Sequence, residues 1–212
     1  MVMESGKKLD IKNEILRKCI HVGYSAVPFL YLFTNKQVII PVVIALSVFM
    51  IAVDLGRIKF QWLQNFYMMT LGKILRSHET DNSKSLFTGG TYIVLSSLFC
   101  FLIFSKNVAI SAMFITTFGD TSAALYGKYF GKIKMFGKTL EGSLVFFITG
   151  CVILYFMGLL SGVFLIPALV ALTITTVLEL LPIPIDDNIT IPVSFCLVFL
   201  GMSVFTGAGC GC

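Results

Sequence analysis

The residues best suited to chemistry lie in one stretch, FGDTSAALYGKYFGKIKMFGKTLEGS, which runs from Phe118 to Ser143. Asp120 stands near its beginning, Glu141 stands near its end, and glycines and lysines alternate between them. Glycines let backbone N–H groups approach phosphate closely. Lysines neutralise phosphate charge, and carboxylates hold the divalent cation that accompanies a nucleoside triphosphate. The pattern predicts a nucleotide site with Mg²⁺ held by Asp120 and Glu141. The alternative is a basic loop with glycines for tight turns.

The glycines and lysines in question are Gly119, Gly127, Lys128, Gly131, Lys132, Lys134, Gly137, Lys138 and Gly142. The segment GKIKMFGKT within them is not a phosphate-binding P-loop. Five residues separate Gly131 from Gly137 where that motif requires four, and no strand precedes it. Phosphate binding here therefore needs a different scaffold.

A second acidic group lies in LELLPIPIDDNITIP, from Leu178 to Pro192. Two adjacent carboxylates, Asp186 and Asp187, with the amide of Asn188 beside them, can bind a metal or act as a base toward a hydroxyl. Helix capping by these residues is the alternative. Capping accounts for Asn188, but it explains neither the two adjacent aspartates nor Glu179, which lies upstream in an apolar run.

A third group opens the first apolar run, in LRKCIH. Arg17 and His21 are four residues apart and share a helix face, while Lys18 points elsewhere. Arginine can clamp phosphate in a bidentate fashion, and His21 can donate a further hydrogen bond. The alternative is a basic anchor at the membrane interface. The nearby pair of Asp54 and Arg57 is interpreted as structural.

These groups must be positioned by membrane helices, because 57% of the 212 residues are hydrophobic and only 13% are charged. Soluble domains carry about 25% charged residues. We expect a single all-α polytopic membrane domain over 1–212, with about seven transmembrane helices of roughly 20 residues. A helix period between 58 and 69 predicts one more, amphipathic helix in the membrane interface. The apolar runs lie near 20–34, 38–53, 86–105, 107–127, 143–160, 163–181 and 189–206.

Charge predicts the orientation of the chain. With a cytoplasmic N-terminus, the inner segments 1–19, 54–85 and 128–142 hold fourteen of the sixteen Lys and Arg, and only Lys36 and Lys106 lie outside. This satisfies the positive-inside rule and puts the C-terminus outside. All eleven acidic residues also fall at or near the cytoplasmic face, which places the chemistry inside the cell.

The ordered motifs RK-x-x-H, D-x-x-R, G-D-T-x-A-A-x-x-G-x-x-F-G-K, G-K-T-x-E-G-S and E-x-L-P-x-x-x-D-D-N-x-x-x-P resemble the CTP-dependent lipid-alcohol kinases. That group comprises dolichol kinase, phytol and farnesol kinase, and CTP-using diacylglycerol kinase. The motifs run from Arg17 to Pro192. The related phosphatidate cytidylyltransferases share two of these motifs, but this chain lacks the acidic signature near their C-terminus.

The resemblance implies transfer of the γ-phosphoryl group of CTP to the hydroxyl of a membrane lipid alcohol, with Mg²⁺ as cofactor. Such an enzyme would reside in the plasma or inner membrane of a bacterium, or in the endoplasmic reticulum of a eukaryote. A homo-oligomer is left open, and nucleic acid is not expected as a partner.

The resemblance also suggests roles for individual residues. The catalytic residues would be Asp120, Asp186, Asp187 and Lys138, and the metal ligands would be Asp120, Glu141 and Asp187. The nucleotide would contact Arg17, Lys18, His21, Lys128, Gly131, Lys132, Thr139 and Asn188. Either Asp186 or Asp187 would accept the proton of the lipid hydroxyl.

Two rival functions remain at this point. A cytidylyltransferase would attack the α-phosphate of CTP and release pyrophosphate instead of CDP. A transporter would line an ion path with polar residues across the full depth of the membrane, whereas the outer half of each apolar run here is free of ionisable residues.

Overall fold

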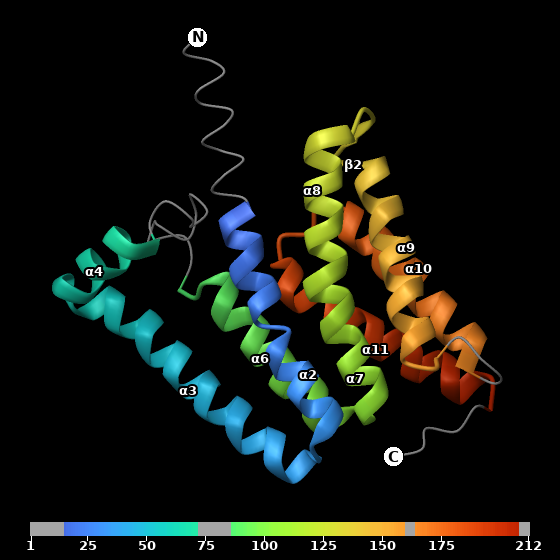
Figure 1. The fold of residues 1–212 in the computed structure, drawn as a ribbon, viewed down its shortest axis with the longest axis horizontal. Coiled ribbons are helices and arrows are strands. Elements are labelled where there is room, and N and C mark those ends of the chain that lie inside the picture. The colour runs from blue at the N-terminus through green and yellow to red at the C-terminus, as the bar shows by residue number, and fades with distance from the viewer. Residues whose placement is uncertain (1–14, 72–85, 160–163, 208–212) are drawn as a thin grey trace.

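The computed structural model describes residues 15–71, 86–159 and 164–207. Within them the chain is helical apart from one small β-ribbon, which agrees with the all-α prediction (Figure 1). A helical stretch at 15–23 comes first. The helices that follow are α2 (Ala26–Phe33), α3 (Lys36–Lys59), α4 (Gln61–Leu71), α6 (Gly89–Ile103), α7 (Lys106–Phe114), the π-helical turn η1 (Ile115–Gly119), α8 (Asp120–Phe130), α9 (Leu140–Phe156), α10 (Leu165–Leu180) and α11 (Asp187–Phe205).

Each predicted apolar run contains helix. Three helical stretches of the described residues are long and apolar enough to cross a membrane: Lys36–Lys59, Lys106–Phe130 and Asp187–Phe205. Helices α6, α9 and α10 are apolar but shorter, at 15, 17 and 16 residues respectively. The chain therefore has the helices of a membrane protein, while seven spans and the proposed orientation stay predictions.

The first run, expected at 20–34, is not one continuous helix. A turn at Tyr24 and Ser25 separates the helical stretch 15–23 from α2. The second run extends past its expected end at 53, so that Asp54 and Arg57 lie inside α3. Residues 1–14 of the inner segment predicted at 1–19, and residues 72–85 of the one predicted at 54–85, lie outside the described residues.

Helix α4 occupies part of the insert that was expected to lie in the membrane interface. It follows α3 after a single non-helical residue, Phe60. Its large apolar side chains are exposed, with Trp62 69% and Met69 79% accessible. Exposed Trp on a short amphipathic helix is typical of headgroup depth.

A long central helix runs from Lys106 to Phe130 and comprises α7, η1 and α8 (Figure 1). It is the most buried of the three long helices, and it packs against α9, α11, α6 and α2. Its buried hydroxyls on Ser111, Thr116 and Thr117 donate to carbonyls one turn back in the same helix. Internal bonding of this kind allows polar side chains to be buried without an unsatisfied donor.

Helix α3 lies at the edge of the bundle and packs mainly on α6 (Figure 1). Asp54, 1% exposed, fixes the ends of these two helices. It pairs with Arg57 at 3.1 Å and accepts from the Thr88 backbone N–H at 2.8 Å and the Thr91 hydroxyl at 2.6 Å. A carboxylate with so many partners is stable when buried, which supports the structural interpretation of the Asp54–Arg57 pair.

Helices α3 and α7 begin at the end of the bundle opposite β2 (Figure 1), and their first residues are the two lysines predicted outside, Lys36 and Lys106. Lys36 Nζ donates to the Leu102 carbonyl at 2.6 Å, and Lys106 Nζ donates to those of Leu32 and Thr34 at 3.0 and 2.7 Å. Leu102 and Leu32 lie in the last turns of α6 and α2, and Thr34 is the C-cap of α2. Carbonyls at these positions lack an N–H donor inside their own helix. Both lysines therefore cap the C-terminal ends of these helices.

Candidate active site

The loop between α8 and α9 is a β-hairpin, which the sequence analysis did not anticipate. Strands β1 (Lys134–Met135) and β2 (Lys138–Thr139) pair antiparallel through a two-residue turn at Phe136 and Gly137. Both turn residues have positive φ, at 51° and 86°, which is the geometry that two-residue hairpins require. The hairpin carries Lys138 back toward the helix bundle.

Glu141 closes the base of this loop. Its carboxylate accepts from the backbone N–H groups of Lys132 and Ile133 at 3.0 and 3.1 Å. It was expected to hold a metal ion, but in this structure it is bonded to the loop backbone. Thr139, which caps α9, accepts from Gly142 N–H at 3.2 Å.

Glycines bring α8 and α9 into close contact behind the hairpin. A Cβ added at Gly127 would overlap Thr139 Oγ1, and one at Gly142 would lie 2.9 Å from the Ala123 carbonyl. The Thr139 side chain and the α8 backbone leave no room for side chains at these two positions. The sequence pattern predicts phosphate binding by these glycines, whereas packing alone already requires Gly127 and Gly142.

We expect Gly127→Ala to lower the thermal unfolding midpoint of the purified protein, because the new methyl group displaces the Thr139 cap. Gly201→Ala in α11 is the matched control, since a Cβ there meets nothing within 4 Å. Without a clash, Gly→Ala within a helix stabilises by up to about 1 kcal/mol. The control should therefore unfold at the same or a higher temperature, and equal midpoints for both variants would refute the packing argument.

A buried ion pair joins the N-terminal helical stretch to the central helix. Lys18, 4% exposed, places Nζ 2.5 Å from Asp120 Oδ2 and 3.3 Å from the Asp120 carbonyl. His21, one turn along, donates from Nε2 to the Thr116 carbonyl at 3.3 Å and lies 3.9 Å from Asp120 Oδ2. Thr116 belongs to the π-helical turn η1, and such turns are frequent at functional sites.

A second charged group surrounds Lys138. Its Nζ lies 2.9 Å from Glu179 Oε1 and 3.0 Å from Asp187 Oδ2, and it also donates to the Glu179 carbonyl. Ser143 donates to Glu179 Oε2 at 2.9 Å. Burial opposes the charge on Lys138, but Asp187 and Glu179 outweigh it and raise the pKa of Lys138 above its ordinary value. Lys138 is therefore a cation throughout the physiological pH range.

Both charged groups face one polar cavity of about 540 Å³ beneath the hairpin. Three carboxylates line it: Asp120, Glu179 and Asp187. Its cations are Arg17, Lys18, Lys128, Lys134 and Lys138. A polar cavity bounded by five cations and three carboxylates suits a polyanion that arrives with a divalent cation.

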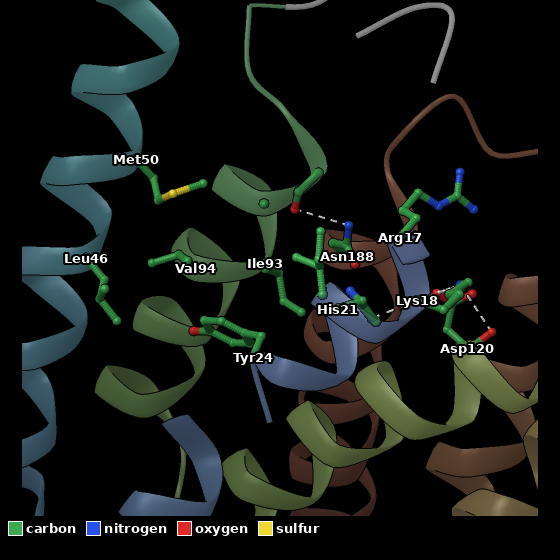
Figure 2. A pocket seen from close by; sticks show the side chains of 13 residues that line it. Arg17, Lys18, His21, Tyr24, Leu46, Met50, Ile93, Val94, Asp120 and Asn188 are labelled. Carbon is green, nitrogen blue, oxygen red and sulfur yellow. Dashed lines mark hydrogen bonds and ion pairs between the residues drawn. The ribbon is translucent and has the colours of Figure 1, made fainter. Parts of the chain in front are cut away.

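An apolar cavity of about 340 Å³ adjoins the polar one (Figure 2). Leu46 and Met50 of α3 face Ile93 and Val94 of α6 across it. The two cavities share three lining residues: Arg17, Lys18 and Asp120. The Lys18–Asp120 pair therefore stands where an apolar molecule and a polyanion would meet.

The structure divides the predicted site residues between these cavities. The polar cavity is lined by Arg17, Lys18, Asp120, Lys128, Gly131, Lys138, Thr139 and Asp187. The apolar cavity is lined by Arg17, Lys18, His21, Asp120 and Asn188. The linings do not include Lys132, Glu141 or Asp186. Asp186 caps α11 by accepting from Asn188 N–H at 2.9 Å. This agrees with the helix-capping interpretation of these residues.

Glu179 is not among the site residues predicted from the sequence. Its signal was a lone carboxylate in an apolar run, which is costly unless paired. In the structure it is 4% exposed and bonded to Lys138 and Ser143. Its partner Lys138 is 41 positions away in the chain, so no local pattern predicts this pairing.

Magnesium fits the donors that are present. The described residues contain no group of three or more His, Cys, Asp and Glu side chains that could hold a metal ion. Mg²⁺ is, however, usually bound by one or two carboxylates together with substrate phosphates and water. Asp120 and Asp187, two of the three predicted ligands, line the polar cavity, and Glu179 joins them there.

Comparison with known proteins finds relatives among lipid kinases. The chain is 30% identical over 148 residues to CTP-dependent diacylglycerol kinase 1 of Saccharomyces cerevisiae, an alignment that covers 66% of this chain and 49% of that protein. The chain thus spans about half the length of that relative. It is 28% identical to CTP-dependent diacylglycerol kinase 1 of Schizosaccharomyces pombe, over 90% of this chain and 94% of that protein. No family model matches the chain, and no solved structure matches it.

Some relatives have nearly the same length and carry no functional name. An uncharacterized protein of Rickettsia prowazekii is 27% identical over 90% of this chain and 95% of its own length. An uncharacterized protein of Methanocaldococcus jannaschii is 29% identical over 85% of this chain and 89% of its own length. Proteins of this size therefore occur in bacteria and archaea as well as in fungi.

Proposed function

Starting from the chain's relationship to the CTP-dependent lipid kinases, we propose that it transfers the γ-phosphoryl group of CTP to the hydroxyl of a membrane lipid alcohol. The products are a lipid monophosphate and CDP. The names of its fungal relatives make diacylglycerol the first substrate to test. Isoprenoid alcohols such as polyprenols and phytol present the same primary hydroxyl on an apolar chain.

The single observation that carries this proposal is the junction of the two cavities at Lys18 and Asp120. A lipid kinase must bring a triphosphate and a hydroxyl on a hydrocarbon chain to one point. The polar cavity provides the charge that a triphosphate needs, and the apolar cavity provides the hydrocarbon surface. A transporter requires no such meeting of an apolar and a polyanion site.

Phosphoryl transfer depends on positioning and charge neutralisation more than on covalent chemistry by the protein. Lys138 and Lys128 bind the triphosphate in the polar cavity, and Arg17 and Lys18 neutralise it at the junction. The lipid hydroxyl oxygen attacks the γ-phosphorus, the bond to the β–γ bridging oxygen breaks, and CDP leaves. The hydroxyl proton passes to Asp120, the carboxylate that lines both cavities.

This assignment favours Asp120 over Asp186 and Asp187 as the proton acceptor. Asp186 caps α11, and Asp187 lines only the polar cavity. Asp187 and Glu179 would hold Mg²⁺ together with phosphate oxygens and water. The bound ion would neutralise charge on the β- and γ-phosphates.

The products of the reaction test the proposal. Purified protein in lipid vesicles containing diacylglycerol should transfer label from [γ-³²P]CTP to the lipid. Label from [α-³²P]CTP should remain in CDP, because the α-phosphate stays on the nucleotide. A cytidylyltransferase needs a lipid phosphate as acceptor, so in vesicles that also contain phosphatidate it would give the opposite result, with α-label in the lipid and release of pyrophosphate. Absence of label transfer from either nucleotide to any lipid alcohol, isoprenoids included, would overturn the proposal.

A further inference from the structure

The apolar walls of the cavity shown in Figure 2 come mainly from α3 and α6, two helices that carry none of the proposed catalytic residues. One wall is α3, through Leu46 and Met50, and the other is α6, through Ile93 and Val94 (Figure 2). The α6 side chains are buried, whereas the two on α3 are only half-buried. The cavity is thus accessible on the α3 side, where α3 forms the edge of the bundle (Figure 1).

The far end of this cavity is polar. Lys18, His21 and Asp120 lie there, and Asn188 donates to the Gly89 carbonyl at 3.2 Å. Tyr24, also in the lining, shares a 2.5 Å hydrogen bond with Ser97. A space with hydrocarbon walls and one polar end fits a molecule with a polar group at the end of an apolar chain.

The volume also limits the occupant. An engineered apolar cavity of about 150 Å³ stays dry and takes up a benzene-sized molecule. The cavity here, at about 340 Å³, has room for a segment of one hydrocarbon chain. At its α6 end, a Cβ on Gly90 would lie 2.9 Å from the Met50 terminal carbon. Met50 therefore packs directly over the bare backbone of Gly90 and narrows the cavity.

We propose that this cavity binds the hydrocarbon chain next to the reacting hydroxyl, and that Leu46 and Met50 of α3 determine the width of the chain that fits. The inference rests on the proposed lipid kinase function. It adds a subsite between α3 and α6 that binds the hydrocarbon chain of the lipid. The lipid enters from the bilayer past α3, and its hydroxyl reaches the Lys18–Asp120 junction.

Leu46→Phe tests this subsite by filling the cavity with a larger side chain. We expect the KM for dioleoylglycerol in vesicles to rise about tenfold or more, while the KM for CTP changes less than twofold. Val48→Phe is the matched control, because Val48 lies on the same helix but is 62% exposed and outside the lining. The two KM values of the control should match those of the wild type. Met50→Ala should act oppositely to Leu46→Phe and improve turnover of lipids with branched isoprenoid chains.

A second measurement does not depend on turnover. Wild-type protein in vesicles is irradiated with diacylglycerol or with phosphatidylcholine, each carrying a diazirine on one acyl chain, and labelled peptides are identified by mass spectrometry. We expect diacylglycerol to label the segments around 46–50 and 90–94 several times more than phosphatidylcholine does. Equal labelling by both lipids, or an unchanged lipid KM in active Leu46→Phe protein, would overturn the subsite. Neither result would affect the proposed function, which fails only if the wild type makes no lipid phosphate.

Discussion

Asp120→Asn should reduce formation of lipid phosphate by about three orders of magnitude, within the range observed when a positioned proton acceptor is lost. The amide keeps the shape of the carboxylate but carries no charge. It can neither take the hydroxyl proton nor balance Lys18, whose Nζ lies 2.5 Å away. The measurement is label transfer from [γ-³²P]CTP to diacylglycerol in vesicles.

The same variant also leaves Lys18 buried without its counter-charge. Removing one partner of a buried pair costs about 3–5 kcal/mol, so loss of activity could reflect unfolding alone. The double variant Lys18→Met with Asp120→Leu separates the two effects, because apolar residues of similar volume replace a buried pair at little cost. We expect its thermal midpoint to recover while activity stays lost. If activity recovered together with the thermal midpoint, the Lys18–Asp120 pair would have a structural role only.

Lys138→Met should raise the KM for CTP and lower kcat, with kcat/KM falling by about a hundredfold or more. Losing one preorganised donor to a developing charge costs about 10²–10³ in rate. Here the loss also leaves Glu179 and Asp187 facing the cavity without the cation between them, so that they repel the triphosphate. The KM for the lipid should change little, since Lys138 lines only the polar cavity.

Two further measurements make this prediction specific. Lys138→Arg retains the charge and should recover part of kcat/KM, whereas Lys59→Met, at the end of α3 and outside both cavities, should behave as the wild type. Because its carboxylate neighbours raise the pKa of Lys138, its charge is present below that pKa and is lost only as pH rises through it, beyond the ordinary lysine range. A wild-type alkaline limb near neutral pH would therefore have to come from another group. Wild-type kcat/KM in Lys138→Met would exclude the residue from the nucleotide site.

Several features could be predicted because they depend on local sequence. Apolar runs of about 20 residues indicate membrane helices, and each run contains helix in the structure. The carboxylate and lysine sets around Asp120 and Asp187 could be identified because charges in apolar surroundings require partners. The ordered motifs indicated the CTP-dependent lipid kinases, and the fungal relatives confirm that resemblance.

Other features escaped prediction because they depend on which helices touch. Lys18 was expected to point away from the face of Arg17 and His21, yet the packing of the first helical stretch on the central helix brings it onto Asp120, 102 positions away. Glu141, predicted as a metal ligand, accepts from the backbone N–H groups of Lys132 and Ile133 just before β1, a contact that no local pattern predicts. Neither the hairpin geometry nor the helix crossing is encoded in any one segment.

By itself the sequence determined that the chain is a helical membrane protein with acids and cations suited to a nucleotide, because hydropathy and charge act residue by residue. Only the tertiary structure decided how those groups divide between a polar and an apolar cavity, and that Lys18 and Asp120 join them. The reason is physical. A cavity is the space that packed helices leave between them, and its walls come from residues far apart in the chain.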